Sequence, residues 1–278
     1  MLFNEKLKML RKQSNFTQEE LAEKLYVSRQ AITKWESGDG TPDIENLKQI
    51  SIVFNTTIDE LIKEDINVTI ENREQYTYIE ELEIDHTKHF DIHICKIYEL
   101  NILPNTQEIV KIELLSNKEG NLEESFKIKF DDLYNRLDID IKNKKQVEDV
   151  IINMYLPEKY IEEIELNSKI KILNISNLEM NKLEYDGDLK YLNVKNLKGK
   201  IVLNTTKCDI EANYDKLDGI LEVNTINSTA RVEIPRETKY KTVLKGIKNE
   251  FVNSIDTEDS QNIIELNGIN SKLIIIEK

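Results

Sequence analysis

The sequence predicts a two-domain protein of mixed class, in which a five-helix bundle with a helix-turn-helix is followed by an all-β domain built as a solenoid. Two observations support this division. Helix-start signals and helical spacing of apolar residues occupy residues 1–63, whereas apolar and polar residues alternate over residues 82–278. We assign the polar stretch between them, residues 64–81, to a linker, with an edge strand through the alternating Ile66, Val68 and Ile70 as the alternative.

The segment 17–37 predicts two short helices joined by a tight turn. Thr17 and Glu20 have the spacing of a capping box, in which the two side chains and two backbone amides exchange hydrogen bonds. Ser28 is suited to cap a second helix. Because residues 25–27 alone separate the two helices, the connection between them must be tight.

The second helix of this pair has two chemically different faces. At about 100° per residue, Ala31, Ile32 and Trp35 fall on one apolar arc, and we expect them in the core. The opposite arc carries Arg29, Gln30, Thr33 and Lys34. Cations, amides and hydroxyls are the groups that bond base edges and phosphates in a major groove. An ordinary amphipathic helix with a solvated polar face would show the same pattern.

Three further helices are expected around this pair. The first covers residues 2–14. The glycine-rich stretch 38–40 ends the second motif helix, and Pro42 opens a fourth helix in the first-turn position that proline favours. Thr57 and Glu60 repeat the capping-box spacing and predict the start of a fifth, short helix.

Three sequence blocks resemble, in order and spacing, the XRE family of phage-repressor-type helix-turn-helix domains: LAEKLYVSRQAITKWESG, TPDIENLKQISIVF and TIDELI. The resemblance extends from the N-terminus to about Lys63 and implies a five-helix fold that binds double-stranded DNA. In that family the DNA contacts come from the start of the first motif helix and from the exposed side of the second. Carried over to this chain, the implied DNA-binding residues are Gln18, Ser28, Arg29, Gln30, Thr33 and Lys34.

The same resemblance implies structural roles. The family often pairs an arginine of the first helix with a glutamate late in the recognition helix, and these residues are Arg11 and Glu36 here. We expect this pair to be structural. We also expect a structural role for Trp35, because its position in the helical period places it in the core. Tyr26 departs from the family pattern, which often has glycine there because the turn favours a positive φ. A tyrosine in that conformation costs about 1 kcal/mol.

From residue 82 onward the sequence predicts successive β-strands. Runs such as FDIHICKI, EIVKIELL and RLDIDI alternate apolar and polar residues. Later strands resemble one another: Leu166, Val194 and Val223 occupy similar places at nearly equal separations, and ILEVNTINSTARVEI recurs as IIELNGINSKLIIIE. This repetition favours stacked rungs of a β-solenoid, with a β-sandwich of similar hairpins as the alternative.

Asparagine follows an apolar strand residue at several repeated positions, and its tolerance of the left-handed conformation suits it to corners. We therefore expect corners at Asn167, Asn174, Asn204, Asn224 and Asn267. The pattern of this half resembles the right-handed β-helical domains of the adhesin type found in bacterial envelope-stress and regulatory proteins. The resemblance implies a right-handed coil and a recognition or assembly module, with no catalytic residues to carry over.

Charge, cysteine content and hydropathy limit the function. The net charge is −14: residues 1–65 carry nine Lys and Arg against 12 Asp and Glu, and the remainder carries 29 against 40. Binding to DNA phosphates therefore requires cations gathered on one face. Two distant cysteines and the lack of a leader-like or long apolar segment predict a cytoplasmic protein without membrane insertion. No phosphate-loop, nucleophile-elbow or zinc-protease motif occurs, so we expect neither catalysis nor a cofactor.

A histidine-rich stretch, DHTKHFDIHIC, is the one candidate metal site. His93 and Cys95 share a strand face with Asp91, and His86 or His89 folded back would complete a set of nitrogen, oxygen and sulfur ligands suited to zinc. The spacing matches no known metal motif. Polar residues on a solvated strand face are therefore the alternative.

Together these features predict a sequence-specific transcriptional regulator, a repressor rather than an activator. Because the chain is acidic, we expect tight DNA binding from a homodimer on paired half-sites. The β domain is expected to sense a peptide or protein effector or to mediate assembly. The alternative function is an antitoxin-like or scaffold protein-interaction module without specific DNA targets.

Overall fold

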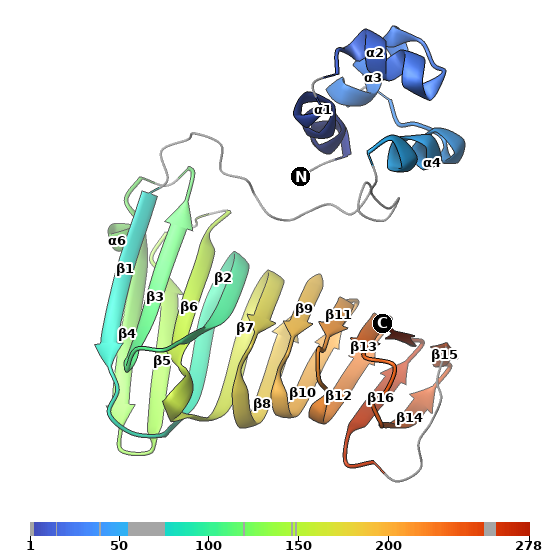
Figure 1. Ribbon diagram of the computed structural model, residues 1–278. Coiled ribbons are helices and arrows are strands. Elements are labelled where there is room, and N and C mark those ends of the chain that lie inside the picture. Colours follow the sequence, from blue (N-terminus) through green and yellow to red (C-terminus); the bar gives the residue numbers. More distant parts are fainter. Residues whose placement is uncertain are drawn as a thin grey trace. The chain divides into compact units, whose positions relative to one another are not determined.

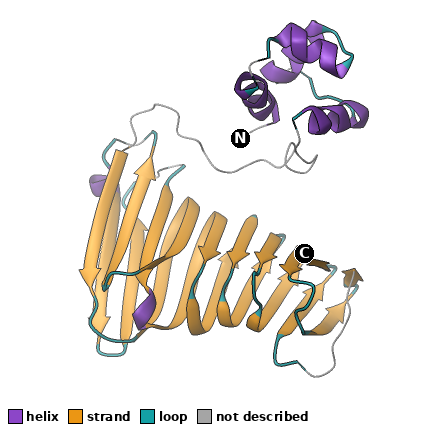
Figure 2. Cartoon of the chain, viewed as in Figure 1, coloured by secondary structure: helices purple, strands orange, loops and turns teal. Residues whose placement is uncertain are grey.

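The computed structural model describes residues 3–14, 16–38, 40–54, 76–118, 120–145, 147, 149–252 and 260–278. The chain forms two compact units, Met1–Arg73 and Glu74–Lys278. The first is helical and the second consists mainly of strands (Figure 2).

The described residues of the helical unit form four helices: α1 (Phe3–Gln13), α2 (Gln18–Leu25), α3 (Arg29–Ser37) and α4 (Ile44–Val53) (Figure 1). The fifth helix expected at Thr57 lies outside the described residues. Apolar side chains of the four helices meet in one core, whose buried members are Leu7, Leu21, Ala22, Leu25, Ile32, Trp35 and Ile50. Trp35 is 7% exposed, as its helical phase predicts.

Helix capping follows the sequence signals. The Glu20 amide donates to Thr17 Oγ1 at 3.1 Å, and the Thr17 amide donates to Glu20 Oε2 at 2.7 Å. The Ala31 amide donates to Ser28 Oγ at 3.2 Å at the start of α3. Tyr26 ends α2 in the left-handed conformation, with φ 56° and ψ 37°. The turn thus has the positive φ of the family pattern although it carries a tyrosine.

The β unit is a single sheet of 17 strands within the described residues, and it curls around a buried apolar core (Figure 1). In chain order its elements are β1 (Tyr76–Glu83), β2 (Lys88–Asn105), β3 (Ile109–Ser116), α6 (Leu122–Ser125), β4 (Phe126–Leu133), β5 (Arg136–Asn143), β6 (Ile151–Pro157), a 3-10 turn (Glu158–Tyr160), β7 (Ile161–Ser176), β8 (Glu179–Asp188), β9 (Tyr191–Lys195), β10 (Lys198–Thr206), β11 (Asp209–Asn213), β12 (Asp218–Ile226), β13 (Thr229–Ile234), β14 (Lys241–Ile247), β15 (Glu250–Val252), β16 (Ile263–Ile269) and β17 (Lys272–Glu277).

Parallel pairing forms two ladders. One runs from β7 through β8, β10 and β12 to β16 and β14. The other runs from β7 through β9, β11 and β13 to β17 and β15. The pairs β4–β5, β1–β3 and β3–β6 are antiparallel and lie at the other end of the sheet. Stacked parallel rungs are typical of a solenoid, whereas a β-sandwich packs antiparallel sheets face to face.

The last rung is inserted between two earlier ones. Strand β16 pairs with both β12 and β14, and β17 pairs with both β13 and β15. The sequence similarity of the final strands to β12 and β13 is therefore a register match, in which Glu222 lies beside Glu265 and Asn224 beside Asn267.

The expected spacing of the rungs, from Leu166 to Val194 and from there to Val223, is wrong. Leu166, Tyr185, Leu203 and Val223 are successive partners in one ladder, so two further rungs separate Leu166 from Val223. Val194 belongs to β9, in the other ladder. Strands of the two ladders look equivalent in sequence because both alternate apolar and polar residues in the same way.

The expected corner asparagines are strand residues. Those at 167, 174, 204, 224 and 267 all lie within strands, and the amides of the last four hydrogen bond to asparagines in register on neighbouring rungs. The non-glycine residues with left-handed φ in this part of the chain are Asp149, Asn177, Asn196, Lys207, Asn227, Lys248 and Asn270. Asparagine is used at corners, as its conformational tolerance predicts, but a few residues later in each repeat.

The expected linker also needs correction. Strand β1 begins at Tyr76 and pairs with β3 along its whole length, so residues 76–81 belong to the sheet. Residues 64–75 lie outside the described part of the chain. None of the helices described has the length and apolar character that crossing a lipid bilayer requires.

Candidate nucleic-acid interface

Helix α3 presents a polar face to solvent. Ile32 and Trp35 are buried on one side of the helix. The exposed side chains are those of Arg29, Gln30, Thr33 and Lys34. The Arg29 guanidinium lies 3.9 Å from the carboxylate of Glu19, and both side chains are largely exposed. Such a surface pair is weak, so a phosphate or a base edge can compete for this arginine.

A buried polar network holds α3 against α1 and α2. Arg11 donates from Nε to Glu36 Oε1 at 2.6 Å and from Nη2 to Glu36 Oε2 at 3.0 Å. Its third nitrogen, Nη1, donates to the carbonyl oxygen of Phe16 at 2.8 Å. Gln18 Nε2 donates to Glu36 Oε2 at 2.9 Å. The expected ion pair between Arg11 and Glu36 is therefore present, and one glutamate ties three helices together.

The ionised form of Glu36 is favoured despite burial. Its side chain is 3% exposed, and this desolvation is the largest effect and raises its pKa. The hydrogen bonds from Arg11 and Gln18, with the charges of Arg11 and Lys8, outweigh it, so the pKa of Glu36 lies below its usual value. Glu36 therefore keeps its charge at neutral pH and holds Arg11 in place.

The network reaches the exposed face through Gln18. The Thr33 hydroxyl lies within hydrogen-bond distance of Gln18 Oε1, at 3.3 Å, and of the Arg29 carbonyl oxygen, at 3.1 Å. Gln18, expected at DNA, is thus only half exposed, with its amide group oriented by Glu36. Because one amide hydrogen of Gln18 is used by Glu36, its other hydrogen is the one available to an outside acceptor.

Tyr26 departs from the family pattern in the turn, and the sequence predicts no contact of its side chain with a partner. Its side chain is 91% exposed beside the N-terminus of α3. A phenol at this position can donate to a phosphate. The helix-turn-helix motif does not predict the exposure of Tyr26, because the exposure of a turn residue depends on how the two helices pack.

The structure does not gather the histidine-rich stretch into a metal site. His86 contacts Asp85 and the carbonyl oxygen of Tyr134. His89 lies 3.5 and 3.7 Å from two glutamates of β7, and His93 lies 3.2 Å from Asp91. Among the residues described, no three His, Cys, Asp or Glu side chains are placed to hold a metal ion.

Cys95, the fourth proposed ligand, is a partly buried thiol. Burial raises its pKa, which disfavours the thiolate that binds metals.

The fold and the exposed face of α3 define the N-terminal unit as a helix-turn-helix domain, and residues 7–61 match the family model described as Helix-turn-helix. The chain is 55% identical over 86 residues to the HTH-type transcriptional activator BcrR of Enterococcus faecalis, covering 28% of this chain and 42% of that protein. It is 39% identical over 61 residues to the cryptic phage CTXphi transcriptional repressor RstR of Vibrio cholerae, covering 22% and 54%. The resemblance to phage-repressor-type domains is confirmed.

The chain spans about half the length of the curated relatives that it matches. Among solved structures it is similar to a candidate cell adhesion protein from Clostridium sporogenes ATCC 15579, with 15% identity and a TM-score of 0.41, over 73% of this chain and 100% of that one. A candidate adhesin from Bacteroides fragilis NCTC 9343 gives 12% identity and a TM-score of 0.30 over 72% and 97%. Scores this low support no conclusion about function.

Proposed function

We propose that this protein is a sequence-specific DNA-binding transcription regulator. The observation that carries the proposal is the exposed polar face of α3, held in a fixed orientation by the buried bonds of Glu36 to Arg11 and Gln18. A rigid helix with two cations, an amide and a hydroxyl on one side suits a major groove. The similarity of this unit to transcriptional regulators supports the same function.

Each exposed residue has a distinct role in this proposal. Arg29 and Lys34 contact guanine O6 and N7, and Gln30 contacts adenine. Gln18 and Ser28, at the N-termini of α2 and α3, bind phosphates and fix the register on the duplex.

The regulator acts as a homodimer and as a repressor in this proposal. Two recognition helices about 34 Å apart would read half-sites one helical turn apart. Pairing also doubles the number of cations at the DNA-facing surface of an otherwise acidic protein, because the exposed faces of two α3 helices then meet the phosphates together. A dimer on a promoter blocks transcription by occupancy alone. Residues 1–63 carry DNA binding.

The β unit serves as the sensor or assembly module of this cytoplasmic, non-catalytic regulator. Its rungs wind in a right-handed coil, the sense that parallel strand–crossover–strand connections strongly favour. The repeated parallel ladders expose long, regular side-chain rows, which are surfaces for recognition.

Selection from a randomised duplex pool, followed by fluorescence anisotropy on the selected sequence, tests the DNA function. Arg29→Ala and Gln30→Ala each weaken binding to that sequence by roughly 1–3 kcal/mol and relax preference at one base position. Lys216→Ala, a charge-matched control in the β unit whose side chain is 78% exposed, leaves the affinity unchanged.

Two outcomes would contradict the proposal. A pool that yields no enriched sequence removes specific DNA binding. Recovery of the same partner from lysate with and without nuclease would then favour a protein-interaction module of the antitoxin or scaffold type. An equal loss on every sequence for Arg29→Ala would show that this arginine contacts phosphate and not a base.

A further inference from the structure

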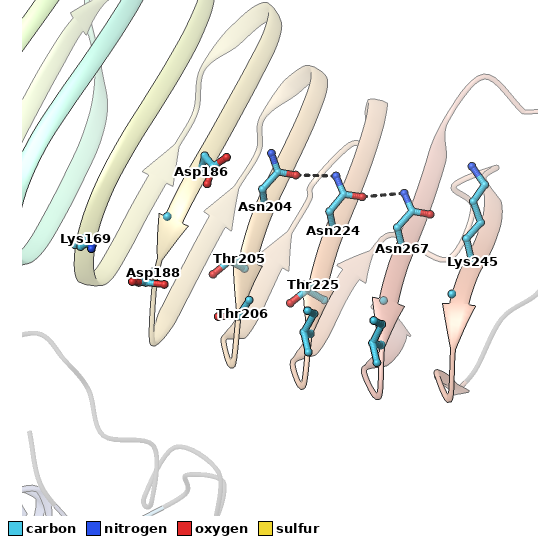
Figure 3. A pocket seen from close by; sticks show the side chains of 15 residues that line it. Lys169, Asp186, Asp188, Asn204, Thr205, Thr206, Asn224, Thr225, Lys245 and Asn267 are labelled. Atoms are coloured by element: carbon cyan, nitrogen blue, oxygen red, sulfur yellow. Dashed lines mark hydrogen bonds between the residues drawn. The ribbon is translucent and has the colours of Figure 1, made fainter.

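A groove of about 700 Å³ crosses the surface of the β unit over strands β8, β10, β12, β16 and β14 (Figure 3). It runs along the stacking direction of the rungs, perpendicular to the strands. None of the residues that the sequence predicts to bind a partner lines this groove. One wall is a row of polar side chains, and the other is largely apolar.

One wall is a row of polar side chains in register across the five strands: Asp186, Asn204, Asn224, Asn267 and Lys245. The three amides form a ladder, in which Asn224 donates to Asn204 and Asn267 donates to Asn224, each at 2.8 Å (Figure 3). The second N–H of Asn224 points to Glu222 at 3.3 Å. Both amide hydrogens of Asn224 are thus engaged within the protein.

The amide oxygens of this ladder keep capacity to accept. Asn204 Oδ1 and Asn224 Oδ1 each receive one ladder bond and have a second lone pair. Asn267 Oδ1, at the end of the ladder, is buried and has no hydrogen-bond partner among the described residues, so the acceptors for a ligand are the oxygens of Asn204 and Asn224. A ligand against this wall must therefore supply hydrogen-bond donors, such as hydroxyl or amide side chains.

The other side of the groove is largely apolar. Thr206, Ile226 and Ile269 are neighbours in register on β10, β12 and β16. The two isoleucines are 41% and 48% exposed, so each leaves apolar surface in water. Covering that surface favours a ligand with apolar groups along one edge.

The two ends of the groove differ in charge. Asp186 and Asp188 are both exposed at the β8 end, and neither forms an ion pair with a residue in the described part of the chain. Lys169 also lines this end, as the register partner of Asp188, so the three charges leave it net negative. At the β14 end Lys245 has a side chain that is 62% exposed, with one carboxylate, that of Glu265, at 2.7 Å. A ligand that is cationic at one end and anionic at the other matches this polarity.

The length of the groove fits a short peptide. Five neighbouring strands span four gaps of about 4.8 Å, or about 19 Å. An extended chain advances about 3.3 Å per residue, so about six residues fill this distance. Its side chains point alternately to the two sides, which matches one polar and one apolar wall.

We propose that this groove binds a free, extended peptide of about six residues. Its N-terminal ammonium lies between Asp186 and Asp188. Its polar side chains donate to the amide oxygens of Asn204 and Asn224, and the apolar side chains that alternate with them cover Ile226 and Ile269. Its C-terminal carboxylate lies at Lys245. The groove would then be the effector site of the proposed regulator, although peptide binding is measurable without DNA.

Isothermal titration calorimetry on the full chain tests the proposal with the peptide Ser-Val-Ser-Val-Asn-Val carrying free termini. The same peptide with an acetylated N-terminus and an amidated C-terminus binds about tenfold more weakly, because both end charges are lost. The double variant Asp186→Asn with Asp188→Asn weakens the free peptide about fivefold and leaves the affinity of the capped peptide unchanged. The control is the charge-matched double variant Asp209→Asn with Asp218→Asn, whose two positions lie outside the groove. It leaves the affinities of the free peptide and of the capped peptide unchanged.

The apolar wall has its own comparison. Ile226→Ser weakens both peptides by a similar factor, whereas Ile276→Ser, which removes a comparably exposed isoleucine from β17, has no effect. Absence of binding by the free peptide, equal affinity for the capped peptide, or equal losses in the control variants would overturn the proposal. DNA binding is measured separately on the same proteins, so a chain that binds DNA but no peptide refutes this inference alone.

Discussion

Glu36→Gln provides the sharpest test of how the helical unit orients its exposed face. The wild-type carboxylate is 3% exposed and accepts three hydrogen bonds, two from Arg11 and one from Gln18. Breaking a fully buried ion pair costs about 3–5 kcal/mol. Because the Arg11 side chain is 12% exposed and keeps its bond to Phe16, we expect a loss of about 2–3 kcal/mol.

Urea unfolding followed by tryptophan fluorescence measures this loss. Trp35 is the only tryptophan in the sequence and lies in the core of the helical unit, so its signal reports on that unit alone. With a slope of about 1 kcal/mol/M, the urea midpoint falls by about 2–3 M. The control is Glu19→Gln, because Glu19 and its ion-pair partner Arg29 are both largely exposed. This substitution changes the urea midpoint little. Equal shifts for the two variants would refute the reasoning.

The pH dependence gives a second readout of the same residue. The folded pKa of Glu36 is below its usual value, so its contribution is complete above the unfolded pKa of about 4.3 and is lost as the pH falls through the folded value. The difference in stability between wild type and Glu36→Gln therefore shrinks below about pH 4. A difference that stays constant down to acid unfolding would show that the ionised carboxylate is not what stabilises the unit.

Two further predictions concern single side chains. Tyr26→Gly raises the urea midpoint of the helical unit by about 0.5–1 M, because Tyr26 has φ 56° and, at 91% exposure, little packing to lose; a lower midpoint would mean that the tyrosine makes stabilising contacts. Cys208 does not react with Ellman's reagent at pH 8 in a folded Cys95→Ser background, since burial, with the nearby charge of Asp209, raises the pKa of its thiol to about 12. Reaction before urea is added would show that β11 opens in the native state.

Much of the helical unit could be predicted from local sequence because caps and turns act over a few residues. Thr17 and Ser28 cap α2 and α3 as their spacing predicts. The pairing of Arg11 with Glu36 joins residues 25 positions apart, and it was expected from the family resemblance and not from spacing. The bond from Gln18 to Glu36 had no sequence signal, because it requires α2 and α3 to be packed together.

The β unit shows where a period-two pattern stops being informative. Alternation identified the strands but not their ladder, so Leu166 and Val194 were equated although they lie on different ladders. The same limit applies to asparagine: its chemistry suits both a left-handed corner and an amide ladder. The position of each asparagine in the strand register decides which role it takes. Asn224 lies beside Asn204 on the neighbouring rung and joins the amide ladder, whereas Asn227 follows the end of β12 and forms a corner with φ 55°.

By itself the sequence determined the division into a helical and a β part, the two motif helices with their caps, the polar composition of the exposed side of α3 and the repetition of the strands. These features depend on residues close together in the chain or on simple periodicity. Tertiary structure alone decided which strands are neighbours, that the last rung is inserted before the penultimate one, and that a polar and an apolar row border one groove. Each of these depends on register between strands far apart in sequence, which hydrogen bonding and core packing fix only when the chain is folded.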